Sequence, residues 1–207
     1  MKKLLILVAM CIGLTSILVG CSNTTDNHPS QIAPMRLSDS QQQIVDLVTG
    51  TGQEILLFDY NLNGMFNSIK VWVEILRYGE PLGKFAGLHI LGNPAFPLSD
   101  GQLAIAINWH ANNEFRWMIS AGSGRSNSES WIADSDSLAR AFGPIVDATP
   151  IEDGREILLY ISKFTDGPLR STNDLQNYLL HPEALAGYTY VHLIKARFSQ
   201  NPQNCKN

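Results

Sequence analysis

Apolar side chains occupy every second position of Ser68–Leu76, where Ile69, Val71, Val73 and Ile75 alternate with mostly polar residues. A period of two residues is that of a β-strand with one buried face. Similar apolar or alternating stretches, bounded by turn-forming residues, predict the other strands: Ile55–Tyr60, Phe85–Leu91, Leu103–Trp109, Glu114–Ser120, Glu156–Phe164 and Tyr188–Phe198. This many short strands within one domain predict a β-sandwich or a barrel.

Some of these strands carry further information about the sheet. The middle of Tyr188–Phe198 is apolar on both faces, which is typical of a central strand that is covered on both sides. Ile55–Tyr60 and Ser68–Leu76 are joined through Asn61-Leu62-Asn63-Gly64, and an Asn-Gly pair favours the positive φ angles of a tight turn. We therefore expect these two strands to pair as a hairpin.

Short helical patterns interrupt the strands. Gln41–Val48 fits a short helix or a first strand, and the helix is favoured. Asp134–Ser137 supplies capping residues before the apolar patch Leu138–Phe142, and Ser171–Asp174 does the same before Leu175–Leu180. The chain is therefore expected to be mainly β, with a single β-sandwich-like domain and two or three short helices.

The first residues of the chain follow a different pattern. Two lysines at positions 2 and 3 precede an apolar run that extends to Val19 and ends in small residues before a cysteine. These are the parts of a signal peptide. The stretch Leu18-Val19-Gly20-Cys21 resembles the lipobox of bacterial lipoproteins.

The resemblance to bacterial lipoproteins implies cleavage between Gly20 and Cys21 and a diacylglyceryl group, with palmitate-like chains, on the Cys21 thiol. Two acyl chains hold a protein on a bilayer, because each buried methylene contributes about 0.8 kcal/mol. The protein is then expected to be lipid-anchored at the extracytoplasmic face of the cell membrane, or at the outer membrane if the source has two membranes. A transmembrane anchor is less favoured, because Gly13 and Thr15 interrupt the apolar run and it is shorter than the roughly 20 residues of a spanning helix.

These features divide the chain into four segments. Residues 1–20 are the predicted signal peptide, 21–36 the lipidated cysteine and a flexible tether, 37–200 the β-rich domain and 201–207 a polar tail. The tether is rich in Ser, Asn, Thr and Pro, a composition that buries too little apolar surface to offset the entropy of ordering. The order of the first two predicted strands is similar to the openings of uncharacterised lipoproteins of Gram-positive bacteria, which implies no activity.

Charge and cysteine content narrow the possible partners. Removal of residues 1–20 takes away two of the 15 basic residues, so the formal net charge changes from −4 to −6. No run of basic residues is left, which makes nucleic acid a poor candidate partner. Cys205 is the only cysteine besides Cys21 in the processed chain, so we expect no internal disulfide, and apolar burial must supply most of the stability.

One turn resembles half of a metal site. Asp59, Asn61 and Asn63 followed by Gly64 are similar to the first half of a calcium-binding loop. Lys70 stands where such a loop has its bidentate glutamate, so a simple turn is the favoured interpretation. The chain also contains no zinc motif and no recognised hydrolase motif. The sequence therefore predicts no metal, no cofactor and no set of catalytic residues.

A group of aromatic and polar residues is the best candidate for ligand binding. Trp109, His110 and Trp131 lie at predicted strand ends or loops, where sandwiches usually carry function. Aromatic faces beside amide, hydroxyl and carboxylate groups suit a polar ligand such as a glycan or a peptide. We expect any small-molecule site to involve these residues and not the Asp59 turn.

The observations support a membrane-anchored extracytoplasmic lipoprotein whose β-rich domain binds a ligand or another envelope protein. Two alternatives stay open: a cell-envelope hydrolase with a dispersed active site, and a structural accessory subunit of an envelope complex. A pocket that joins a histidine, a carboxylate and a hydroxyl would favour the hydrolase, whereas an exposed apolar patch would favour the accessory subunit.

Overall fold

The computed structural model describes residues 29–49, 53–92, 97–109, 114–131, 138–169 and 175–201. Strands dominate the described chain, and its helices are few and short. The elements are β1 (Gln31–Pro34), α2 (Asp39–Val48), β2 (Gln53–Asn61), β3 (Ser68–Arg77), β4 (Glu80–Leu91), β5 (Gly101–Trp109), β6 (Glu114–Ala121), β7 (Gly124–Trp131), β8 (Ala139–Pro144), β9 (Thr149–Pro150), β10 (Glu156–Thr165), α3 (Asn177–Leu180), the 3-10 helix η2 (Pro182–Leu185) and β11 (Tyr190–Ser199).

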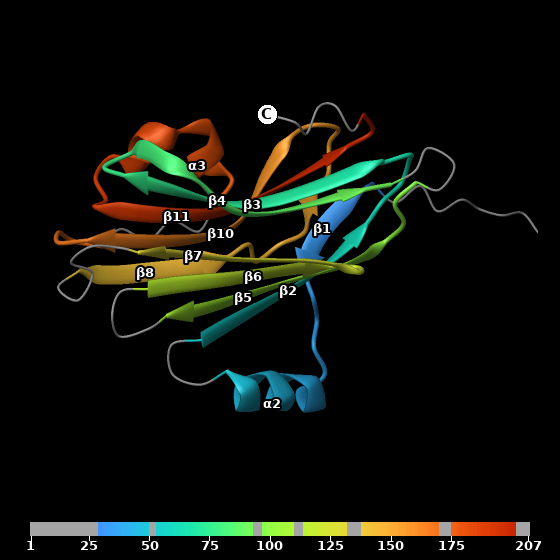
Figure 1. Cartoon of the computed structure of the whole chain (residues 1–207), viewed down its shortest axis with the longest axis horizontal. Coiled ribbons are helices and arrows are strands. Elements are labelled where there is room, and N and C mark those ends of the chain that lie inside the picture. The colour runs from blue at the N-terminus through green and yellow to red at the C-terminus, as the bar shows by residue number, and fades with distance from the viewer. Residues whose placement is uncertain are drawn as a thin grey trace, which may run out of the picture.

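The strands form two antiparallel sheets that lie one over the other (Figure 1). The first, sheet A, has the order β7-β6-β5-β2-β1-β9. The second, sheet B, has the order β4-β3-β11-β10-β8. The prediction of a mainly β, sandwich-like domain is therefore confirmed.

Alternating apolar residues build the core between the sheets. On β3 the side chains of Val71 and Val73 are fully buried, and on β5 those of Ile105 and Ile107 are buried to within 1%. Successive residues of a strand point to opposite faces, so every second residue of each sheet faces the other sheet. Burial of one such side chain stabilises the fold by about 1.5–3 kcal/mol.

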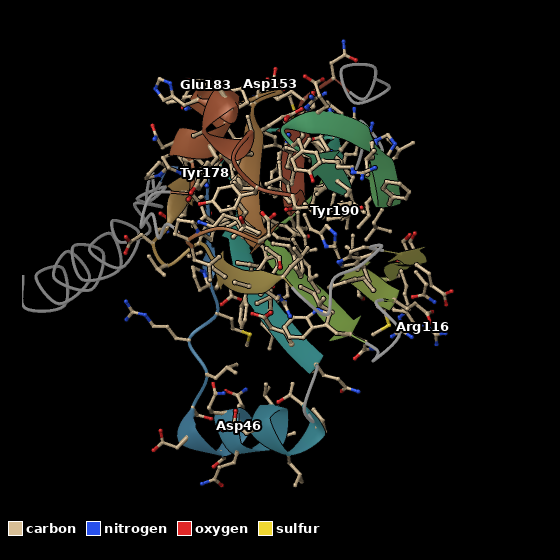
Figure 2. The ribbon with its side chains drawn as sticks, turned by 90° about the vertical axis from the view of Figure 1, so that its left-hand side faces the viewer. Asp46, Arg116, Asp153, Tyr178, Glu183 and Tyr190 are labelled. Atoms are coloured by element: carbon tan, nitrogen blue, oxygen red, sulfur yellow. The ribbon has the colours of Figure 1, made fainter. Side chains whose placement is uncertain are left out.

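β11 is the central strand of sheet B, as its two apolar faces predicted. Its inner face contributes Ile194 and Phe198 to the core. The segment that contains α3 and η2 lies over the outer face of sheet B (Figures 1 and 2). Tyr178 of this segment is buried, and its hydroxyl accepts a hydrogen bond from Lys163 Nζ of β10 at 3.1 Å.

The predicted hairpin of Ile55–Tyr60 with Ser68–Leu76 is wrong. β2 pairs with β1 and β5 in sheet A, whereas β3 pairs with β4 and β11 in sheet B. The turn itself forms, because Gly64 adopts a φ of +126°, but it carries the chain from one sheet to the other. Phe66 anchors this crossing: it is 3% exposed and its ring packs edge-on against Phe198. Burial of Phe66 in the common core thus decides against local pairing.

The predicted helix at Leu138–Phe142 is also wrong, because this stretch forms the edge strand β8. Arg140 and Phe142 lie opposite Phe164 and Ser162 of β10. Ala, Leu and Arg favour a helix intrinsically, but a helix of five residues is too short to be stable by itself, and the edge of β10 offers this segment backbone pairing over Ala139–Pro144. The capping residues Asp134–Ser137 lie outside the described residues.

The helix predicted over Gln41–Val48 is confirmed as α2, and the one predicted over Leu175–Leu180 shortens to α3.

β1 lies within the segment predicted as a tether, yet it pairs with β2 and β9 and so belongs to sheet A. The predicted signal peptide, Cys21 and Cys205 lie outside the described residues. Among the described residues, no helix is long and apolar enough to cross a membrane.

An aromatic cluster joins the two sheets around His192. The His192 ring lies 4.8 Å from the ring of Phe115 and 5.3 Å from that of Trp117, both on β6, and 5.4 Å from that of Phe164 on β10. His192 is 1% exposed, and its Nε2 has no hydrogen-bond partner among the described residues. Burial, followed by the positive charge of Arg140, lowers the pKa of His192 from 6.5 to about 3. The imidazole is therefore neutral in the folded protein at neutral pH.

We predict that acid weakens the fold through His192. The unfolded chain protonates this histidine near its usual pKa of about 6.5, whereas the folded chain does so only near pH 3. The stability due to neutral His192 is therefore full above pH 6.5 and declines as the pH falls toward 3, at about 1.4 kcal/mol per pH unit in between. Urea unfolding at pH 7, 5.5 and 4 measures this slope.

His192→Phe keeps an aromatic ring in the cluster and is expected to remove this part of the slope. His181→Ala is the matched control, because His181 is exposed. An unchanged slope in His192→Phe would show that other groups cause the acid sensitivity.

Candidate functional site

The helix α2 is stabilised locally and not by burial. The backbone N–H of Gln41 donates to Ser38 Oγ, and the backbone N–H of Ser38 donates to the Gln41 side chain, which completes a capping box. No residue of α2 is buried, and Ile44, Leu47 and Val48 are 62%, 85% and 55% exposed. The helix lies below the strands of sheet A (Figures 1 and 2). It therefore presents apolar side chains that the core does not use.

The outer face of sheet A continues this apolar character. Leu57 of β2, Ala104 of β5 and Ser120 of β6 form one row across the sheet, and Ile55, Ala106 and Met118 form the next row. These residues alternate with the buried inner-face residues of the same strands. A strand face that looks outward is usually polar in an antiparallel sandwich. The apolar rows thus mark a surface that another group is suited to cover.

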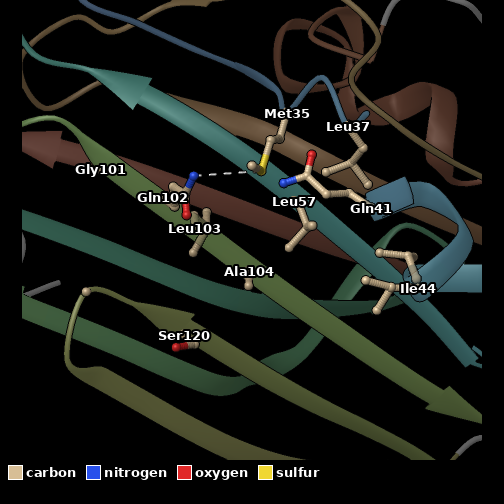
Figure 3. A pocket seen from close by; sticks show the side chains of 12 residues that line it. Met35, Leu37, Gln41, Ile44, Leu57, Gly101, Gln102, Leu103, Ala104 and Ser120 are labelled. Carbon is tan, nitrogen blue, oxygen red and sulfur yellow. Dashed lines mark hydrogen bonds between the residues drawn. The ribbon is translucent and has the colours of Figure 1, made fainter. Parts of the chain in front are cut away.

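A groove runs between α2 and this face of sheet A (Figure 3). Its volume is about 620 Å³, within the range of about 300–1,000 Å³ that is common for small-molecule sites. None of its lining residues carries a charge, and most are apolar: Met35, Leu37, Gln41, Ile44, Val45, Leu57, Gly101, Gln102, Leu103, Ala104, Ser120 and Gly122. Flexible thioether and Leu side chains let such a surface adapt to a ligand.

A second, acidic hollow continues the groove at one end. It has a volume of about 440 Å³ and shares Gly101 and Gln102 with the groove. Asp59 and Asp100 line it. Asp59 Oδ1 accepts a hydrogen bond from Gln102 Nε2 at 3.1 Å, and Asp100 Oδ1 accepts one from the Leu62 backbone N–H at 2.7 Å. Groove and hollow together form a trough with an apolar and an acidic half.

The calcium-like residues of the Asp59 turn divide between two roles. Asp59 lies in the acidic hollow beside Gln102, as described above, whereas the backbone carbonyl of Asn63 accepts a hydrogen bond from Ser30 Oγ. No cluster of three or more metal-ligating His, Cys, Asp or Glu residues occurs within the described part of the chain. The turn therefore links the start of β1 to the end of β2.

The predicted ligand-binding residues lie at the other end of sheet A. Trp109 ends β5 and is opposite Phe115 of β6, and the backbone of Trp131 ends β7 opposite Glu114 of β6. Trp109 and residue 131 are therefore at the same end of the sheet with β6 between them. His110 lies outside the described residues, as does the side chain of Trp131. A site at these residues stays a prediction.

The arrangement around Ser162 and His192 comes nearest to a hydrolytic site. These two residues lie directly opposite each other on β10 and β11. However, Ser162 Oγ accepts a hydrogen bond from Arg140 Nε at 3.1 Å, and His192 Nε2 has no partner among the described residues. Within the described residues, no hydrogen bond therefore joins this serine to a base, which is the contact that activates a nucleophile.

Comparison with family models, with curated proteins and with solved structures finds no match to this chain. Sequence reasoning missed the groove, although Ile55-Leu56-Leu57-Phe58 is an unbroken apolar run and so has apolar side chains on both faces of β2. What it lacked was the position of α2 over that face.

We predict that Leu47→Gln leaves the stability of the fold unchanged. Leu47 is 85% exposed and Gln has a similar helix propensity, so the free energy of unfolding should change by less than about 0.5 kcal/mol. Urea unfolding measures it, with the buried Leu56→Gln as the contrasting variant. A loss of several kcal/mol in Leu47→Gln would mean that α2 packs against the domain more closely than its exposure indicates.

Proposed function

We propose that this chain is a lipid-anchored extracytoplasmic protein whose β-sandwich binds an amphiphile with one acyl chain in the trough between α2 and sheet A. The anchor rests on the lipobox-like stretch that ends at Cys21. The proposed ligand class is inferred from the chemistry of the trough. One observation carries the proposal: an uncharged, mainly apolar groove shares the lining residues Gly101 and Gln102 with a hollow lined by two carboxylates.

The apolar half suits an unbranched hydrocarbon chain. A chain needs no hydrogen bonds, and each methylene transferred from water contributes about 0.8 kcal/mol. A charged group in this half would lose hydration without an ionic partner, since no lining residue is charged. Gln41, Gln102 and Ser120 supply the few polar groups that orient a ligand in a mainly apolar site.

The acidic half selects the head of the ligand. Asp59 and Asp100 repel an anionic head and accept hydrogen bonds from hydroxyl or ammonium groups. A monoacylglycerol or an alkylamine therefore fits the trough better than a fatty acid of equal length. This preference distinguishes the site from a nonspecific apolar surface, which would bind ligands of equal chain length with the same affinity whatever their head group.

We predict that the trough binds 1-monodecanoyl glycerol at least about tenfold more tightly than decanoate, which corresponds to about 1.4 kcal/mol. The chain from residue 21 onward with Cys21→Ser is used, so that no acyl group of its own competes. Displacement of the uncharged dye N-phenyl-1-naphthylamine reports binding below the micelle concentration. Ala104→Trp fills the groove floor and is expected to weaken binding about tenfold or more.

Ala106→Trp is the matched control, because it places the same ring on the same face of β5 outside the groove lining. Asp59→Asn and Asp100→Asn together should abolish the preference for the glycerol head. Equal binding of the two ligands by the starting protein, or equal loss in both tryptophan variants, would reject the trough. If Trp109→Ala instead abolished binding, the site would lie at the opposite end of sheet A.

We predict that Cys21 begins the mature chain and carries lipid. Intact-mass analysis of protein extracted from membranes should show residues 1–20 removed and a diacylglyceryl mass added. Cys21→Ala protein is expected to keep its full length and to lose the lipid. Detection of residues 1–20 on the extracted wild-type protein would contradict the anchor, without bearing on the trough.

A docking surface for another envelope protein is the second candidate function. Leu47 and Val48 are highly exposed and do not line the groove, so a ligand in the groove would leave them in water. A partner that covered α2 would bury them. Leu47→Gln separates the two functions, because it should weaken such a partner and leave amphiphile binding unchanged.

A further inference from the structure

The sandwich is open along one side, between β2 and β8. β8 is the edge strand of sheet B, and β1 pairs only with Phe58–Asn61 of β2, so Gln53–Leu56 has no neighbouring strand on that side in the described chain. Phe142 of β8 lies opposite the buried Ser162 and therefore faces inward, yet it is 52% exposed. Solvent thus reaches the space between the sheets at this side.

Arg140 lies at this opening with its side chain held on several sides. Its Cζ is 3.0 Å from the centre of the Trp109 ring and 4.6 Å from that of Phe142. Its Nε donates to Ser162 Oγ at 3.1 Å, and its Nη2 donates to the Tyr160 hydroxyl at 3.4 Å. Aromatic faces and two hydrogen bonds therefore fix the plane of the guanidinium group.

Arg140 has no direct counter-ion in the described part of the chain. None of the ion pairs there includes it. The nearest carboxylate in its network is Glu54 of β2, which is one hydroxyl away: Tyr160 donates to Glu54 Oε2 at 2.8 Å. Burial lowers the pKa of Arg140 and raises the pKa of Glu54, because both charges have lost part of their hydration. A partly buried cation without a direct anion favours an added anion.

The Arg140 guanidinium also has N–H donors that bind no described residue. Of its five N–H groups, the interactions above use one on Nε and one on Nη2. Both donors on Nη1 and the second donor on Nη2 have no partner among the described residues. One donor on Nη1 and the second donor on Nη2 lie together on one edge of the planar group, and this pair matches the two oxygens of a carboxylate.

We propose that Arg140 is a carboxylate-binding site, entered between β2 and β8, and that Phe142 contacts the apolar group next to that carboxylate. The site is separate from the trough and shares no residue with it. The carboxylate belongs either to a free small acid or to the C-terminus of an extended peptide, for which the unpaired edge of β8 offers backbone hydrogen bonds. Trp109, predicted from the sequence as a ligand-binding residue, stacks against the guanidinium group of Arg140.

We predict that the membrane-extracted protein, in an uncharged detergent, binds N-acetyl-phenylalanine at least about tenfold more tightly than N-acetyl-phenylalanine amide, because the amide offers only one acceptor and no charge. NMR titration of the Arg140 Nε–H resonance reports binding directly. Arg140→Lys keeps the charge and loses the planar fork, so it should weaken binding about tenfold. Arg155→Gln is the control, since Arg155 is an exposed arginine paired with Glu152.

A second variant tests the proposal without removing Arg140. Glu54→Gln keeps an acceptor for the Tyr160 hydroxyl and removes the competing negative charge, so it should strengthen carboxylate binding several-fold. A purely structural role of the network would not produce this gain. Equal affinity for the acid and the amide, or weaker binding of the acid by Glu54→Gln, would overturn the proposal. So would displacement of the bound acid by inorganic phosphate at the concentration at which unlabelled acid displaces it.

A comparison of two free acids identifies the source of the carboxylate. Tighter binding of acetyl-Ala-Ala-Phe than of N-acetyl-phenylalanine would support a peptide C-terminus that pairs along β8. Equal binding of the two would support a free small acid. Both results are consistent with a carboxylate at Arg140.

Discussion

Packing of the two sheets around His192 is the constraint on which the rest of the structure depends. The imidazole lies among Phe115, Trp117 and Phe164, and its Nε2 finds no hydrogen-bond partner among the described residues. Such a group is tolerated only where it stays neutral and the surrounding packing is otherwise apolar. The inner faces of the strands are therefore buried in the core. The candidate sites lie on the outer faces, at the ends of the strands and at the open side.

The two outer faces have different chemistry. On sheet B, Lys195 pairs with Glu74, Arg197 pairs with Glu156, and the segment containing α3 and η2 covers part of the surface. On sheet A, apolar rows face an exposed apolar helix across an uncharged groove. Sheet B thus pairs charged side chains of its outer face within the chain, whereas sheet A leaves apolar surface that another molecule could cover.

One feature of the topology produces both proposed sites. β1 ends at Pro34, so it pairs with only half of β2, and the chain then leaves the sheet to form α2. This departure places α2 over the outer face of sheet A and creates the groove. It also leaves Gln53–Leu56 without a neighbouring strand on the side away from β5, among the described residues, and Arg140 and Glu54 lie at this side.

The sequence by itself predicted the strands β2–β6, β10 and β11, because alternating or unbroken apolar runs report a buried face. It did not predict β1, β7, β8 and β9, which are short or carry few apolar residues. It also predicted β11 as a central strand and Gln41–Val48 as a helix, since both signals are local. Only the tertiary structure decided the partners. Burial of Phe66 sent the Asn63-Gly64 turn across the core, and the free edge of β10 made Leu138–Phe142 a strand. The groove and the Arg140 network join residues far apart in the chain, because long-range packing, which no local pattern encodes, brings β2, β8 and β10 together.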